Sequence, residues 1–260
     1  MTYQLIVSTM NQHDDSLIDK MNIHSDAIII NQSDFFGYHE VPRQDHTIKW
    51  YHFSERGIGL SRNSGMMRAD ADIIQFADDD MVFTQTYYQD VLAEYEKHPE
   101  ADVILFSNKC LNKDRMPYPV DRFGRVRRFE AVKFGGARIT ARREKLLHNN
   151  ITFSLLFGGG ARYKAGEDTT FIQDCIKAGL KVYKSPVIVS TMKQDASSWF
   201  TGFHKKYYVD KGALLAKNFP LISRIGIYIQ AFKNSRHSEH SFKELLGFYQ
   251  EGAREFRRNK

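Results

Sequence analysis

Short apolar runs alternate with helical spacings of apolar residues through the first hundred positions of the chain. A short apolar run bounded by polar residues is typical of a buried strand, and spacing at i, i+3, i+4 and i+7 is typical of a helix with one buried face. The pattern predicts strands over 3–8, 27–31, 48–53 and 103–106 and in the run that ends at Asp78, and helices over 16–21, 61–68 and 86–97. Because strands that alternate with helices form parallel sheets covered on both faces, we predict an α/β fold with a mostly parallel central sheet flanked by helices.

After residue 107 the alternation gives way to loops and one further helix. Pro and Arg are frequent over 116–128, and glycines at 135–136 and 158–160 are expected where the backbone turns or approaches another segment closely. An amphipathic helix is predicted from Glu167 up to Gly179. Its apolar face holds Phe171, Ile172, Cys175 and Ile176.

The last sixty residues predict two amphipathic helices. The apolar stripe of the first comprises Leu221, Ile225, Tyr228 and Phe232, with Ile222 and Ile229 beside it. Ser241 and Glu244 have the spacing of a capping box that opens the second helix. The apolar face of this helix holds Phe242, Leu245, Leu246, Tyr249, Ala253 and Phe256. Two placements stay open: the helices pack on the rest of the protein, or part of their basic, aromatic surface rests on an anionic membrane.

Composition narrows the classes of protein. A chain of 260 residues can bury about 70–75% of its unfolded surface. Its two cysteines, Cys110 and Cys175, lack a metal-ligand spacing, so neither a disulfide framework nor a zinc site is expected. The first residues lack a basic n-region, and the longest largely apolar stretch, near 225–232, is too short to span a bilayer. We therefore expect a cytoplasmic protein.

The net charge of +6 conceals an asymmetry along the chain. Residues 1–112 hold 8 Lys or Arg against 18 Asp or Glu, whereas residues 202–260 hold 12 against 5. An acidic half that binds anionic phosphates needs a metal ion to do so, and a basic half suits a second anionic partner. Ordinary solvated Lys and Arg surface is the alternative explanation of any single basic cluster.

Three consecutive carboxylates, Asp78, Asp79 and Asp80, directly follow a predicted buried strand. Open α/β sheets bind their ligands beyond the carboxyl ends of such strands. Mg²⁺ and Mn²⁺ prefer carboxylate oxygens and often share them with substrate phosphates, so the triplet predicts a metal-bound diphosphate. A solvated acidic turn that caps the next helix is the structural alternative.

The candidate motifs occur in a fixed order. They are Ser8-Thr9 at the end of the first strand, Asn31-Gln32-Ser33-Asp34 at the end of the second, Gly59-Leu60-Ser61-Arg62-Asn63, the Asp triplet, and Glu167-Asp168. This ordered set, over roughly residues 3–200, resembles the family 2 glycosyltransferases of the GT-A fold. The stretch 157–168, with Ser198-Trp199 after it, is similar to the acceptor half of bacterial exopolysaccharide and capsule enzymes.

The resemblance implies a role for each motif. The implied nucleotide-sugar contacts are Ser8, Thr9, Asn31, Gln32, Arg62, Asn63, Asp78 and Asp79. Asp80 with Asp78 would hold the metal, with Asp79 as an alternative direct ligand and Asp78 also directed toward the ribose. The implied acceptor contacts are Gly158, Gly159, Gly160 and Trp199. Asp168 would be the base, and Glu167 would orient it or hold acceptor hydroxyls. Both acids also suit the dipole of a first helical turn.

The resemblance also implies how the chain is organised. Residues 1–107 would form the nucleotide-sugar-binding half of a GT-A domain, and residues 108–201 its acceptor-binding and catalytic half. Residues 202–260 would form a helical, basic C-terminal extension.

The implied reaction is inverting, metal-dependent glycosyl transfer. The donor would be a nucleoside-diphosphate sugar, a UDP-sugar first of all, with Mn²⁺ or Mg²⁺ as cofactor. The acceptor would be a saccharide hydroxyl on a lipid diphosphate, in bacterial cell-surface polysaccharide synthesis at the anionic inner face of the plasma membrane. An acceptor hydroxyl does not ionise at neutral pH, so a carboxylate must take its proton. No nucleic-acid partner is expected.

Two other classes of function stay open. A nucleotidyltransferase shares the α/β sheet and the metal-diphosphate chemistry, but it normally needs a Gly-rich, basic loop after its first strand, which residues 8–12 lack. A nonenzymatic protein could bind nucleic acid or an acidic polymer through the basic half, with a steep dependence on salt.

Overall fold

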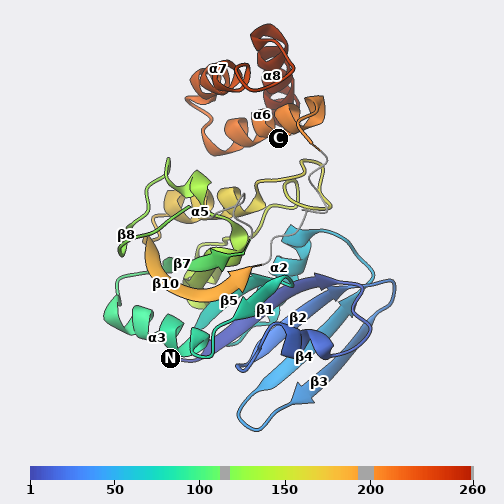
Figure 1. The fold of residues 1–260 in the computed structure, drawn as a ribbon, viewed down its shortest axis with the longest axis vertical. Coiled ribbons are helices and arrows are strands. Elements are labelled where there is room, and N and C mark those ends of the chain that lie inside the picture. Colours follow the sequence, from blue (N-terminus) through green and yellow to red (C-terminus); the bar gives the residue numbers. More distant parts are fainter. Residues whose placement is uncertain (112–117, 193–201, 259–260) are drawn as a thin grey trace.

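The computed structural model describes residues 1–111, 118–192 and 202–258. Figure 1 shows a sheet-containing unit with the helices α6, α7 and α8 beyond one end of it. The elements in chain order are β1 (Tyr3–Met10), α1 (Ser16–Lys20), β2 (Ala27–Gln32), β3 (Gly37–Pro42), β4 (Thr47–Phe53), α2 (Ile58–Arg68), β5 (Ile73–Asp78), β6 (Met81–Phe83), α3 (Tyr87–Lys97), β7 (Val103–Cys110), β8 (Gly124–Arg125), the 3-10 turns η2 (Ala131–Lys133) and η3 (Gly136–Arg138), β9 (Ile139–Arg142), α4 (Arg143–His148), α5 (Glu167–Lys177), β10 (Val182–Met192), α6 (Lys205–Asn218), α7 (Ser223–Asn234) and α8 (Phe242–Arg258).

The strands form a mixed sheet in the order β3-β4-β2-β1-β5-β9-β7-β10-β6, and β8 pairs with β10. The run β4-β2-β1-β5 is parallel throughout, and β7 is parallel to β10. The strand β9 lies antiparallel between β5 and β7, and β3 is antiparallel to β4 at the edge. The predicted α/β fold with a mostly parallel sheet is confirmed.

Side chains alternate between the two faces of the sheet, and each face has its own apolar cluster. Along β1, Leu5 and Val7 pack with α1 and α3, whereas Ile6 packs with Met66 of α2 and Phe171 of α5. In α3 the side chains of Tyr87, Val91 and Tyr95 are fully buried, whereas Tyr88 lies at the border of the cluster. The helices therefore cover both faces, as a parallel sheet requires.

Several observed strands were not predicted from the sequence. The edge strand β3 is exposed along most of its length, so it has no apolar run. The strand β10 is interrupted by irregular register between Lys184 and Ser190. The predicted strands over 3–8 and 103–106 also continue further, because backbone hydrogen bonds extend the ladders through the polar residues that follow.

The C-terminal helices agree with the sequence only in part. The capping box is confirmed: Ser241 N donates to Glu244 Oε2 at 2.8 Å, and the apolar face of α8 is mostly buried. The stripe predicted on α7 is instead exposed, because α7 buries Ser223, Ile227 and Ala231. The unpredicted helix α6 packs closely along α8. None of the described helices has the length and apolar character needed to cross a bilayer.

Two glycines allow α6 and α8 to touch backbone to backbone. A Cβ atom at Gly252 of α8 would overlap the carbonyl oxygen of Val209 in α6. A Cβ atom at Gly212 of α6 would likewise overlap the carbonyl oxygen of Tyr249 in α8. Since neither obstacle is a flexible side chain, the two helices must separate to accept any larger residue.

We predict that Gly252→Ala destabilises the chain by about 1–3 kcal/mol, the usual cost of overpacking. Gly247→Ala in the same helix is the matched control, because a Cβ atom added there would meet nothing within 4 Å. This control should gain up to about 1 kcal/mol from helix propensity. Denaturant unfolding followed by circular dichroism measures both changes, and equal stability of the two variants would contradict the close helix contact.

Candidate functional site

The site lies where β1 and β5 end side by side. In the parallel register Ser8 is opposite Asp78, and on the other side of β1 Thr9 is opposite Asn31. The Ser8 hydroxyl accepts a hydrogen bond from the hydroxyl of Ser61 in α2 at 2.8 Å. The predicted residues at these strand ends are therefore brought together by the sheet itself.

Arg62 is the buried centre of the site. Its side chain is 3% exposed, and it donates to Asp78 Oδ1 at 2.7 Å and to Glu167 Oε1 at 3.1 Å. Burial alone would lower the pKa of Arg62, but the charges of Asp78 and Glu167 raise it above its ordinary value. The guanidinium thereby joins the end of β5 to the start of α5.

Neighbouring residues shape the space around this guanidinium. Its central carbon lies 5.2 Å from the ring centroid of Phe153. On another side, a Cβ atom at Gly136 would come within 2.6 Å of Arg62 Nη1, so only glycine leaves room there. The sequence had indicated Gly136 only as a loop glycine, and no local pattern pointed to its contact with Arg62.

Glu167 and Asp168 begin α5, after Gly166 with a φ of +105°. Burial and the negative charge of Asp168 raise the pKa of Glu167 to about 7, although Arg62 opposes this. Asp168 is half-buried, and its Oδ1 accepts a hydrogen bond from the backbone N–H of Thr169 at 2.6 Å. The two acids thus have different partners, because Glu167 is fixed to Arg62 and Asp168 is held by a backbone N–H.

Asp79 and Asp80 occupy the turn between β5 and β6. The Thr9 hydroxyl donates to Asp79 Oδ2 at 2.5 Å and accepts from the side-chain amide of Gln12 at 2.9 Å. Desolvation, with a smaller contribution from Asp78, raises the pKa of Asp79. Gln12 was not among the predicted site residues, although it follows directly on the first strand.

The carboxylates at the end of β5 suit a metal ion that is held partly by these side chains and partly by the substrate. Within the described residues no group of three or more His, Cys, Asp or Glu side chains is arranged as a complete metal site. Mg²⁺ at phosphate sites is usually held by one or two carboxylates, with substrate phosphates and water completing the shell. The triplet of acids at the end of β5 fits that type of site.

Three predicted nucleotide contacts are engaged with backbone groups. The Asn31 amide exchanges hydrogen bonds with the backbone of Gln12, and Gln32 Oε1 accepts from Gly57 N at 2.6 Å. Asn63 likewise binds both the N–H and the carbonyl of Phe153, at 2.7 and 2.8 Å. These side chains position the loops that surround the site, and a direct contact with nucleotide stays a prediction.

The predicted acceptor glycines lie beside the first turn of α2. The carbonyl of Gly159 accepts from Ile58 N at 3.0 Å, and Gly160 lies against Gly57. Gly158 has a φ of +106°, and a Cβ atom there would come within 2.9 Å of Glu167 Oε2. The loop therefore lies directly beside Glu167. Trp199 lies outside the described residues.

This chain is similar to known proteins in its sequence profile and in its fold. Residues 35–160 match the profile of Glycosyl transferase family 2. A comparison with curated protein sequences finds no match.

The chain is similar in fold to crystal structures of S. aureus TarS. For TarS 1–349 in complex with UDP-GlcNAc, the TM-score is 0.63 with 16% identity, over 94% of this chain and 74% of that one. For TarS 1–349 alone, the TM-score is 0.63 with 12% identity, over 100% and 92%. For a longer TarS structure it is 0.59 with 16% identity, over 93% of this chain and 44% of that one. The matched profile, which includes Arg62, the Asp triplet and the glycine loop, shows a family 2 glycosyltransferase domain within this chain, and the structural likenesses show that the chain has the GT-A fold.

Proposed function

We propose that the chain transfers a sugar from a nucleoside-diphosphate sugar, first of all a UDP-sugar, to a hydroxyl of a saccharide acceptor with inversion. The observation that carries this proposal is the buried Arg62, which joins Asp78 at the donor end of the sheet to Glu167 of the acidic pair. A reaction between two substrates needs both sets of groups at one place. The similarity to TarS, whose structure contains UDP-GlcNAc, supports a UDP-sugar as donor.

Mn²⁺ or Mg²⁺ is the proposed cofactor. Asp80 would be the direct ligand together with Asp78, and Asp79 is the alternative. Asp78 also pairs with Arg62 and Asp79 with Thr9, so each of these two acids has a second role in holding the site together. A divalent ion bound here would neutralise negative charge on the leaving diphosphate.

Asp168 is the proposed base. It is half-buried at the start of α5, where an incoming acceptor hydroxyl can reach it, and the Thr169 N–H holds one of its oxygens. Glu167 would orient the pair through its bond to Arg62. A single base that removes the acceptor proton on the side opposite the leaving group gives inversion, so no covalent nucleophile is required.

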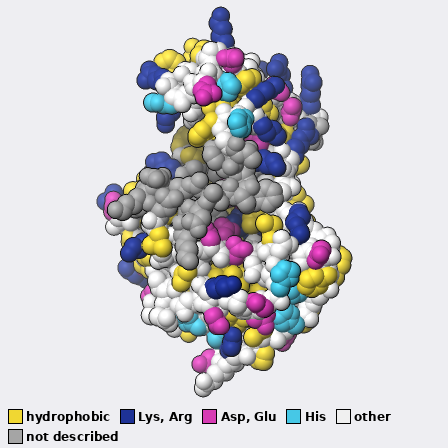
Figure 2. Space-filling model, turned by 45° about the vertical axis from the view of Figure 1, so that its right-hand side comes forward, with side chains coloured by type: hydrophobic (Ala, Val, Ile, Leu, Met, Phe, Trp, Pro, Cys, Tyr) yellow, Lys and Arg dark blue, Asp and Glu magenta, His cyan; other side chains and the backbone are white. Residues whose placement is uncertain are grey.

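The acceptor side is proposed to include Gly158, Gly159, Gly160 and Trp199. Residues 1–107 would bind the donor, residues 108–201 the acceptor, and residues 202–260 would form the extension. The exposed stripe of α7 and the excess of Lys and Arg after residue 202 support contact with an anionic membrane surface. Figure 2 shows Lys and Arg side chains over the C-terminal helices at the top of the molecule. Such a surface would bring the site to a lipid-linked acceptor in cell-surface polysaccharide synthesis.

Binding of a nucleoside diphosphate should require a divalent ion, because the acidic half of the chain otherwise repels the ligand. We predict that EDTA abolishes the UDP binding seen by calorimetry with Mn²⁺, and that Asp80→Asn weakens this binding in the same way. UDP affinity that is unchanged in EDTA would refute the metal-dependent donor site. Parallel titrations with GDP and dTDP identify the preferred base.

Asp168→Asn keeps the shape of the side chain but removes the base. We expect turnover to fall about 10²–10⁴-fold while UDP binding persists. If Asp168 only offsets the helix dipole, the change costs about 0.3–1 kcal/mol of stability and leaves turnover nearly intact. Glu167→Gln is the comparison, with a smaller expected loss of turnover. A larger loss for Glu167→Gln than for Asp168→Asn would reverse the two roles.

The raised pKa of Glu167 predicts a specific dependence of stability on pH. Folding favours the protonated form, so the stabilisation is complete below the ordinary pKa of 4.5 and is lost as pH rises to about 7. Between these pH values the free energy of unfolding of the native chain should therefore fall relative to that of Glu167→Gln. Above them the difference between the two proteins should stay constant. Urea unfolding of both proteins across the range measures the difference. A constant difference would show that the pKa of Glu167 is not raised.

A further inference from the structure

A cavity lies between the start of α5 and the C-terminal helices. Its volume is about 450 Å³, within the range of about 300–1,000 Å³ that is usual for small-molecule sites. Phe129, Val132 and Thr169 line it from the sheet-containing unit, and α6 and α7 line it from the other side. Thr169 is the residue whose N–H binds Asp168, so one end of the cavity adjoins the proposed base.

The walls of the cavity are mainly apolar and poorly covered. Leu214 and Leu215 of α6 and Gly226 and Ile229 of α7 are among the residues that line it. Phe129, which stacks on Phe219 with ring centroids 5.5 Å apart, is 69% exposed, and Ile229 is 56% exposed. Contiguous exposed apolar surface of this kind indicates a binding partner. The polar side chains of Asn218, Gln230 and Asn234 also line the cavity, but most of its exposed surface is apolar.

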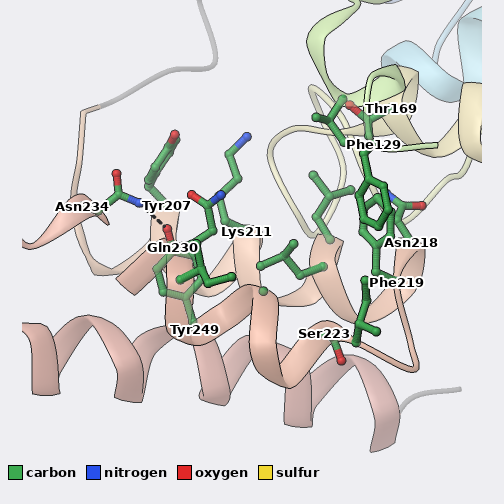
Figure 3. A pocket seen from close by; sticks show the side chains of 16 residues that line it. Phe129, Thr169, Tyr207, Lys211, Asn218, Phe219, Ser223, Gln230, Asn234 and Tyr249 are labelled. Carbon is green, nitrogen blue, oxygen red and sulfur yellow. Dashed lines mark hydrogen bonds between the residues drawn. The ribbon is translucent and has the colours of Figure 1, made fainter. Parts of the chain in front are cut away.

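One cation lies within this apolar lining. Among the described residues, the other lysines of α6 each pair with a carboxylate: Lys205 with Glu251, Lys206 with Asp210, and Lys217 with Asp174. Lys211 has no ion pair with any described residue. Figure 3 shows it between Thr169, Phe129 and Phe219 at one end of the cavity and Tyr207, Gln230 and Asn234 at the other. A lysine placed in this way is suited to an anionic group on an otherwise apolar ligand.

We propose that this cavity, lined by Phe129, Leu214, Leu215, Gly226 and Ile229, binds the hydrocarbon chain of a lipid phosphate, with Lys211 contacting the phosphate. Through its Ile229 wall the cavity is continuous with the exposed stripe of α7, which gives the chain a route to a lipid bilayer. The inference rests on the proposed glycosyltransferase function and deepens it, because it makes the acceptor an amphiphile whose polar end lies toward Asp168.

The test is calorimetric titration of the full chain with farnesyl phosphate below its micelle concentration. The buffer contains EDTA, so that the metal-dependent donor site does not contribute. We expect farnesyl phosphate to bind more tightly than farnesol and far more tightly than inorganic phosphate. Binding of inorganic phosphate as tightly as farnesyl phosphate would overturn the proposal, because it would indicate a plain anion site.

Gly226→Leu should fill the cavity and weaken farnesyl phosphate binding by about tenfold or more. A Cβ atom at Gly226 meets only Leu215 Cδ2, at 3.6 Å, so the helix can accept a side chain there. The matched control is Gly247→Leu in α8, which adds the same side chain where nothing lies within 4 Å and should leave binding unchanged. Ile229→Glu, at an exposed position, gives a second disruption that does not depend on packing. Native affinity in both cavity variants would overturn the proposal.

Lys211→Gln tests the contact with the phosphate separately from the contact with the hydrocarbon chain. It should weaken farnesyl phosphate binding several-fold and leave farnesol binding unchanged, and an equal effect on both ligands would contradict the phosphate contact.

UDP binding with Mn²⁺, measured on the same native preparation, distinguishes failure of this proposal from failure of the proposed function. If UDP binds but farnesyl phosphate does not, only the lipid cavity is refuted. If UDP does not bind, the proposed donor site is refuted.

Discussion

Arg62 places one buried positive charge between carboxylates that come from opposite parts of the chain. Its partners Asp78 and Glu167 stand 16 and 105 residues away in sequence. A buried charge is tolerated only when it is paired, and removal of one partner from such an arrangement typically costs about 3–5 kcal/mol. The positions of β5, α2 and α5 are therefore coupled, because each contributes one member of this charge cluster.

The surrounding loops keep this cluster accessible without exposing it fully. Glycines at 136 and 158 leave space beside Arg62 and Glu167, where any side chain would collide. The amides of Asn31, Gln32 and Asn63 hold adjacent backbone segments in place. Carboxylates with different degrees of burial thus stand within one site, which is how a protein obtains acids and bases of different strength from the same residue type.

The C-terminal helices pack against the segments that flank the acidic pair. Phe157 and Tyr163, on either side of the glycine loop, pack into the same apolar cluster as α6 and α8. Gly166, which starts α5, also lies against Leu214 of α6. The helices are thus anchored on the segments that carry the acidic pair, and their apolar surface starts beside it.

The sequence by itself determined the elements whose signal is local. Apolar runs predicted β1, β2, β4, β5 and β7, helical spacing predicted α3, α5 and α8, and Ser241 with Glu244 predicted the start of α8. The order of the polar motifs also indicated the family. Only the tertiary structure decided that Arg62 pairs with Glu167, since nothing local couples residues so far apart. It also decided that the stripe of α7 is exposed, because an amphipathic pattern shows that a helix has an apolar face but does not show which neighbour covers it.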